Sequence, residues 1–200
     1  MLTRRTLLAC SVATAAVLAL HPAAWAQAAP EATRFVEEFG SALVSIIDGP
    51  GSYDAKKRQL QPVVERSTDV DGIARFCLGR FWITATPQQQ TEYLQLFHTV
   101  LMTNIFGKLG EFQGVTFAPT TTVQRDRDFL VGTLIKRPNQ QPNNVQWDVT
   151  YINGEPKIVD VIAEGVSIRQ TQRSDYAAYM SRNGNNVDAL LKAMQGQIAR

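Results

Sequence analysis

The chain is poor in the residues that build disulfides and transition-metal sites. It holds two cysteines and two histidines, and Cys10 lies in the first 26 residues, which we interpret below as a leader. From Gln27 onward, Cys77 has no second thiol for an intramolecular disulfide, and His98 is too isolated for a Cys/His metal site. We therefore expect no metal and no cofactor. Cys77 is interpreted as a small buried residue, and His98 as a solvated or hydrogen-bonded helix residue.

The chain after residue 26 also lacks an excess of charge of either sign. All 18 acidic residues and 18 of the 20 basic residues follow residue 26, so the net charge of that part is near zero. This excludes the basic profile of a nucleic-acid binder and argues against strong electrostatic attachment of the whole chain to anionic lipid. The motifs G-x-S-x-G, H-E-x-x-H and the phosphate loop do not occur, and we expect no catalytic residues.

Beyond the start of the chain there is no apolar run of 18 residues, the minimum for a membrane-spanning helix. The start itself has the features of an export signal: Arg4 and Arg5, a small and apolar run over 6–20, and the A-x-A site at 24–26. We predict a signal peptide at 1–26, cleavage before Gln27, and one lipid-binding α+β domain at 27–200. Export could follow either the general secretory route or the twin-arginine route. A lipoprotein box ending at Cys10 is an alternative to cleavage before Gln27.

Hydrophobic periodicity changes along the chain from helical to strand-like. Apolar residues at three- and four-residue intervals predict helices first, and Thr86-Pro87 with Gln89 predicts a capped start for the longest. After Gly110 the period is two, and Asn153-Gly154 is typical of a hairpin turn. The expected helices cover 31–47, 52–64, about 70–78, 86–109, 174–182 and a final one capped by Asn186; the expected strands cover 115–123, 129–136, 145–152 and 156–168.

This order of helices, strands and helices indicates an α+β protein. We expect a curved antiparallel sheet of about four strands packed under N- and C-terminal helices. Gly165, inside the last predicted strand, suggests a bulge or a bend. Such an arrangement can enclose an apolar cavity between sheet and helices.

Two segments resemble the toluene-tolerance family of MlaC-like periplasmic lipid carriers. The first contains L-G-x-x-W at 78–82 and A-T-x-x-Q at 85–89, followed by the long apolar helix; the second contains D-V-x-x-E-G-V-S at 160–167 and then Arg173. The resemblance implies an NTF2-like cone. It also implies a soluble periplasmic protein that ferries phospholipid between an inner-membrane ABC transporter complex and an outer-membrane lipoprotein complex. We expect it to act as a monomer without nucleic acid.

The inward members of the helical stripes and strand alternation are the candidate lipid-binding residues. Ordinary core packing is the more frequent explanation of such stripes, and Trp82 could wall a cavity or fill a core. The candidates are Ile47, Leu60, Val64, Ile73, Phe81, Trp82, Phe97, Leu101, Ile105, Leu134, Val149, Tyr151, Val161 and Val166.

Three alternatives remain beside the phospholipid carrier, and one is a structural or assembly protein without ligand. Pro156 stands before Lys157 where the family usually has Trp, and a side branch of the family accompanies hopanoid synthesis, so a hopanoid is an alternative cargo. Asp160 and Glu164, four apart on one predicted strand face, could serve an NTF2-like enzyme as a buried carboxylate base. We instead interpret them as scaffold residues that pair with Arg169 or Arg173.

Overall fold

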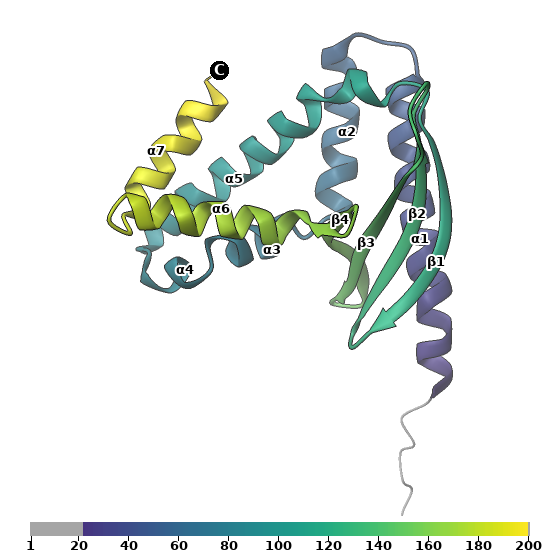
Figure 1. Cartoon of the computed structure of the whole chain (residues 1–200), viewed down its shortest axis with the longest axis horizontal. Helices are drawn as coiled ribbons and strands as arrows, with labels where there is room; N and C mark the ends of the chain where they lie inside the picture. Colours follow the sequence, from purple (N-terminus) through teal and green to yellow (C-terminus); the bar gives the residue numbers. More distant parts are fainter. Residues whose placement is uncertain (1–21, 200) are drawn as a thin grey trace, which may run out of the picture.

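The computed structural model describes the backbone of residues 22–199 and the side chains from residue 28 onward. Residues 1–21, which hold most of the predicted signal peptide, lie outside this part. The elements follow the predicted order of helices, strands and helices (Figure 1). They are α1 (Pro22–Asp48), α2 (Tyr53–Ser67), α3 (Val70–Leu78), α4 (Arg80–Thr84), α5 (Pro87–Gly107), the 3-10 helix η1 (Leu109–Phe112), β1 (Thr116–Arg125), β2 (Asp128–Lys136), β3 (Asn143–Ile152), β4 (Glu155–Ala163), β5 (Val166–Ser167), α6 (Ile168–Arg182) and α7 (Val187–Ile198).

The strands form one curved antiparallel sheet in the order β1-β2-β3-β4-β5, each hydrogen-bonded to its neighbour in sequence. The predicted turn at Asn153-Gly154 joins β3 and β4, and both residues have positive φ, as a two-residue hairpin turn requires. Register shifts occur within β1 and between Asp148 and Val149 of β3. The α+β class and the curved antiparallel sheet are confirmed.

The predicted end of the last strand, at residue 168, was wrong. Glu164 and Gly165 have φ of 52° and 80°, so the chain reverses there, and Ala163 pairs with Val166. Gly165 was expected to bulge or bend a strand that continued through Val166. Two successive positive φ values instead make a tight hairpin. The following helix starts at residue 168 and not 174, because the Ser167 side chain accepts a hydrogen bond from the backbone N–H of Gln170 and caps it.

Predicted helix starts are confirmed at three other places. Thr86 and Gln89 form the reciprocal capping box of α5, Asp69 caps α3 by accepting from the Gly72 N–H, and Asn186 caps α7. In each case a short polar side chain satisfies a backbone N–H that has no partner within the helix.

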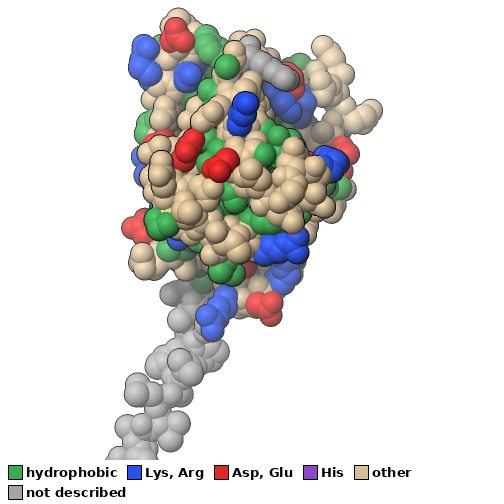
Figure 2. All heavy atoms as spheres, turned by 90° about the vertical axis from the view of Figure 1, so that its left-hand side faces the viewer, with side chains coloured by type: hydrophobic (Ala, Val, Ile, Leu, Met, Phe, Trp, Pro, Cys, Tyr) green, Lys and Arg blue, Asp and Glu red, His purple; other side chains and the backbone are tan. Residues whose placement is uncertain are grey.

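The molecule has two lobes (Figure 1). The sheet lobe contains β1–β5 with α1 and α2, and the helical lobe contains α3–α7. Two chain crossings between the lobes are fixed to β4: the Asp69 N–H donates to the Ile158 carbonyl at 3.0 Å, and the Arg169 N–H donates to Asp160 Oδ1 at 3.0 Å. Seen from the helical end, hydrophobic side chains are visible in small areas between polar atoms (Figure 2).

Candidate functional site

Twelve of the fourteen candidate residues fall into three apolar clusters. The helical cluster contains Ile73, Phe81, Trp82, Phe97 and Leu101. The sheet cluster contains Val149, Tyr151 and Val161. The bridging cluster, between α1, α2 and the end of α5, contains Ile47, Leu60, Val64 and Ile105. The structure buries six of the fourteen candidates and half-buries seven, and it does not bring them together around a single space.

Two of the fourteen face elsewhere. Val166 is 59% exposed on β5, because the hairpin at Glu164-Gly165 carries it away from the predicted strand, and its expected inward position was wrong. Leu134 is half-buried and belongs to none of the three clusters. On β2 it alternates with Phe129 and Val131, which pack toward α1, so Leu134 lies on the opposite sheet face.

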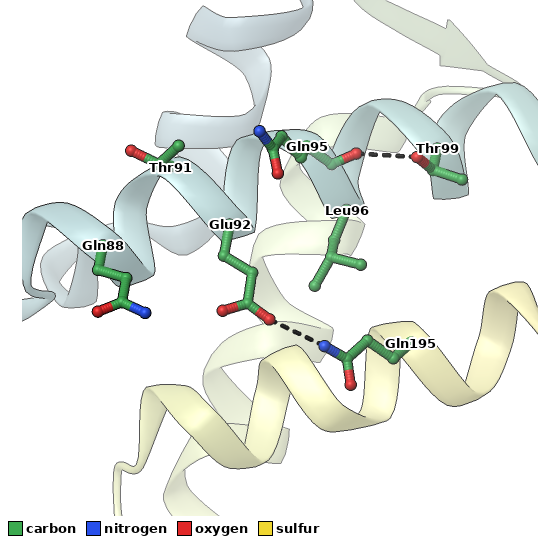
Figure 3. A pocket seen from close by; sticks show the side chains of 7 residues that line it. All are labelled: Gln88, Thr91, Glu92, Gln95, Leu96, Thr99 and Gln195. Carbon is green, nitrogen blue, oxygen red and sulfur yellow. Dashed lines mark hydrogen bonds between the residues drawn. The ribbon is translucent and has the colours of Figure 1, made fainter.

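None of the fourteen lines either of two hollows in the described part of the chain. One, of about 760 Å³, lies between α5 and α7 (Figure 3). In it, Gln195 donates to Glu92 at 2.8 Å. Its lining is Gln88, Thr91, Glu92, Gln95, Leu96, Thr99 and Gln195. The other, of about 440 Å³, lies on the sheet and is lined by residues such as Thr120, Gln146 and Glu164. Both are too polar to hold acyl chains.

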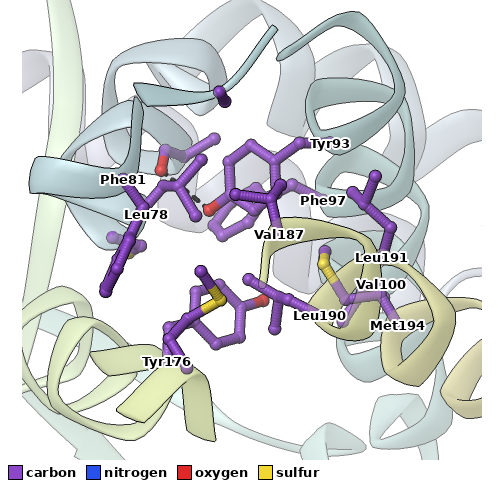
Figure 4. Packing of buried hydrophobic residues seen from close by; sticks show 14 of the residues in the cluster. Leu78, Phe81, Tyr93, Phe97, Val100, Tyr176, Val187, Leu190, Leu191 and Met194 are labelled. Carbon is purple, nitrogen blue, oxygen red and sulfur yellow. Dashed lines mark hydrogen bonds between the residues drawn. The ribbon is translucent and has the colours of Figure 1, made fainter. Parts of the chain in front are cut away.

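Tyr93 is at the centre of the helical cluster (Figure 4). Its ring is fully buried, and its hydroxyl donates to the Ala74 carbonyl at 2.8 Å, which satisfies the polar atom that burial removes from water. Burial raises the pKa of this phenol. Phe97 and Tyr176 lie with ring centroids 5.9 Å and 6.2 Å away, so the centre of the lobe is a packed aromatic core.

Cys77 lies at the edge of this cluster, where α3 meets α6. Its side chain is 1% exposed, and its thiol contacts the Arg169 carbonyl at 3.5 Å. Burial raises the pKa of the Cys77 thiol to about 12, so the reactive thiolate is scarce at neutral pH.

The sheet cluster joins α1 to the concave sheet. Phe39 of α1 meets Trp147 of β3 edge-on at 5.6 Å, and the Trp147 indole N–H donates to the Thr133 hydroxyl at 2.9 Å. Gly40 is required beside them, because a Cβ there would lie 2.6 Å from the Phe117 ring. The helix and the sheet are therefore in close contact.

The bridging cluster connects the two lobes. Met102 and Phe106 of α5 and Leu109 of η1 pack in one cluster with Ile47, Leu60 and Val64. Leu43 of α1 packs against both this cluster and the sheet cluster. The sheet cluster and the bridging cluster thus meet at the half-buried side chain of Leu43.

A charged network lies where α6 leaves the sheet. Asp148 and Asp160 are register partners on β3 and β4, and their side chains are 0% and 4% exposed. Arg169 reaches Asp148 Oδ2 at 3.2 Å and Asp160 Oδ2 at 3.5 Å, and Arg125 also reaches Asp148 at 3.2 Å. Burial raises the pKa of the Asp148 carboxyl, and the two arginines oppose that shift.

Asp160 is engaged on both oxygens. It accepts from the backbone N–H groups of Val161 and Arg169 and from the Ser167 hydroxyl. Pairing with Arg169 was predicted, whereas Arg173 instead donates to the Phe76 carbonyl at 3.2 Å. Glu164 is exposed in the turn, so the expectation that it shares a strand face with Asp160 was wrong. These contacts assign Asp160 to the scaffold.

Some residues of the charged network and of the contacts between lobes were not identified from the sequence. Asp148 stands alone between apolar residues, and its buried role is visible only once β3 and β4 are paired. Phe106 was not among the candidate residues, although it packs in the cluster that joins the two lobes. An aspartate between Trp147 and Val149, in an apolar stretch of a predicted strand, is the sequence signal that could have pointed to the network.

Among residues 22–199, no helix has both the length and the hydropathy of a membrane span. Within the same part of the chain, no three His, Cys, Asp or Glu side chains gather as a metal site.

Comparison with known proteins gives three findings. The model of the MlaC protein family matches residues 37–196. The toluene tolerance protein ttg2D of Pseudomonas putida is 32% identical over 151 residues, which cover 74% of this chain and 68% of that protein. The phospholipid-binding protein of Ralstonia solanacearum, solved in complex with a phospholipid, superposes with a TM-score of 0.75 at 21% identity, covering 84% of this chain and 97% of the other. The family match spans both motif segments and every cluster described above, and on these findings the chain belongs to the MlaC family.

Proposed function

We propose that this protein is a soluble periplasmic lipid carrier that encloses phospholipid acyl chains along the border between its apolar clusters. The observation that carries the proposal is this border: half-buried Ile73, Leu101 and Ile105 adjoin packed clusters, and Leu43 belongs to the margins of two of them. Membership of the MlaC family and the phospholipid in a relative of the same fold support it.

Energetics require such enclosure. A two-chain lipid exposes about 30 methylenes, and at ~0.8 kcal/mol each their transfer from water is worth about 25 kcal/mol. A soluble carrier must therefore cover almost the whole of both chains. Separated clusters can part at their borders with less loss of packing than one continuous core, since the contacts inside each cluster persist.

The route follows from the leader and the family. The first 26 residues direct export, the remainder forms the lipid-binding domain, and the carrier moves between an inner-membrane ABC transporter complex and an outer-membrane lipoprotein complex. The protein has no catalytic role in this proposal, because the buried Asp160 carboxylate is occupied by scaffold hydrogen bonds.

Native mass spectrometry of protein purified from the periplasm, followed by lipid extraction, tests the proposal. Phospholipid bound at one molecule per chain supports it. A hopanoid in its place keeps the carrier and changes the cargo. Protein that copurifies with no lipid and takes up none from vesicles would overturn the proposal.

A further inference from the structure

The end of the molecule that holds the α1–α2 connection carries an excess of basic side chains. Six lysines and arginines from α2, the end of α5 and the end of β2 lie there, all exposed or half-buried, against three acidic residues, Asp48, Asp54 and Glu111. Blue side chains are visible at this upper end in Figure 2. We define the basic end as Lys56, Lys57, Arg58, Lys108, Lys136 and Arg137.

Contacts between the elements hold these residues on one end. Asp48, the last residue of α1, accepts from the Gly114 N–H at 2.8 Å, and a Cβ on Gly114 would lie 3.0 Å from Pro138 in the β2–β3 loop. Lys56 donates to the Ile47 carbonyl at 2.5 Å. The basic end is therefore one continuous surface contributed by segments far apart in sequence.

Its cations lie on the aromatic margin of the bridging cluster. Lys57 Nζ lies 5.1 Å from the centre of the Phe106 ring, and the Arg137 guanidinium lies 5.0 Å from that of Phe112. Phe106 is 2% exposed, and Phe112 is half-buried at the cluster margin. Tyr53, at the start of α2, is 53% exposed. Cations on long aliphatic stems, together with the amphipathic ring of an exposed tyrosine, are typical of surfaces that meet a lipid headgroup layer.

We propose that the basic end docks on the surface of an anionic phospholipid bilayer. Charge complementarity favours that occupant, since the chain as a whole is nearly neutral and the excess of positive charge is local. Flexible cations spread over three elements, without a shaped pocket, suit a fluid layer of phosphates better than the fixed carboxylates of a folded protein. The inference deepens the proposed carrier function and rests on it: docking places the bridging cluster against the bilayer, where acyl chains can cross.

Flotation with vesicles tests the docking. Wild-type protein is mixed with vesicles of phosphatidylcholine alone or of equal parts phosphatidylcholine and phosphatidylglycerol, at low and at high salt. We expect binding to the anionic vesicles at low salt and its loss at high salt, because salt screens charges over short distances. The triple variant Lys57→Glu, Arg58→Glu and Lys108→Glu should bind anionic vesicles at least tenfold less. Lys56 is left intact because it caps α1.

The matched control is Arg127→Glu, Arg182→Glu and Lys192→Glu, three exposed basic residues away from the basic end. It has the same net charge change and should retain most of the binding. Equal loss in both variants, unchanged binding in the first, or wild type that binds an acidic protein but no vesicle would each overturn the proposal. Lipid content of the same preparations is measured separately: lipid-free protein that still docks refutes the carrier, and loaded protein that does not dock refutes the docking surface.

Discussion

Asp148 and Asp160 face each other across β3 and β4, yet their oxygens are used differently. Asp160 accepts hydrogen bonds at both oxygens. Asp148 has its two arginines on Oδ2, and its buried Oδ1 has no hydrogen-bond partner within the described residues. One carboxylate is thus a junction of the scaffold, and the other is a buried charge with incomplete compensation.

The first prediction compares two carboxylates of the family motif. Asp160→Asn should lower the free energy of unfolding by about 2–4 kcal/mol, because an amide cannot replace the acceptor at both oxygens. Glu164→Gln, in the exposed turn, should change it by less than about 0.5 kcal/mol. Urea unfolding measures both. Equal effects would show that the network is not what holds α6 to the sheet.

The second prediction concerns pH. Burial raises the pKa of Asp148 above its ordinary value of 3.8. The stability from this carboxyl is therefore fully present below about pH 4 and is lost as pH rises through the raised folded-state pKa. Asp148→Asn removes that titration.

The unfolding free energy of wild type, measured relative to that of Asp148→Asn, should therefore fall as the pH rises above about 4. Urea midpoints across this range measure it. The opposite slope would mean that Arg125 and Arg169 outweigh the cost of burial.

The third prediction concerns lipid loading. Leu101 is half-buried on α5 at the margin of the helical cluster, so Leu101→Trp should fill the border and reduce bound lipid severalfold with a modest loss of stability. Gln95→Trp, at an exposed position of the same helix, is the control. Val149→Trp is unsuitable, because Val149 is fully buried between α1 and the sheet and overpacking there costs about 1–3 kcal/mol or more. If Leu101→Trp bound as much lipid as wild type, the lipid site would have to lie elsewhere in the protein.

The fourth prediction concerns Gly79 between α3 and α4. Its φ of 59° and ψ of −129° suit glycine, and a Cβ would lie 3.2 Å from the Arg173 guanidinium. Gly79→Ala should cost about 1–3 kcal/mol. Gly107→Ala, at the end of α5 where a Cβ meets nothing within 4 Å, should be neutral or slightly stabilising. Thermal unfolding distinguishes them, and a neutral Gly79→Ala would contradict the described turn.

Local chemistry was readable from the sequence, and long-range pairing was not. The capping box at Thr86 and Gln89 and the turn at Asn153-Gly154 depend on neighbouring residues, so their patterns sufficed. Val166 was misplaced because an alternating run continues through a hairpin as easily as through a bent strand. The partition of the apolar stripes into three clusters depends on how α1 packs on the sheet and how the end of α5 packs on α1 and α2, and residue spacing does not record that.

The isolated thiol at Cys77 gives this protein a natural reporter. Since it is buried against α6 with its ionisation suppressed, an alkylating reagent can reach it at an appreciable rate only when α3 and α6 separate. From Gln27 onward the chain has no second cysteine. The rate of Cys77 modification, measured with and without lipid, would therefore time the opening of the helical lobe in the unaltered protein.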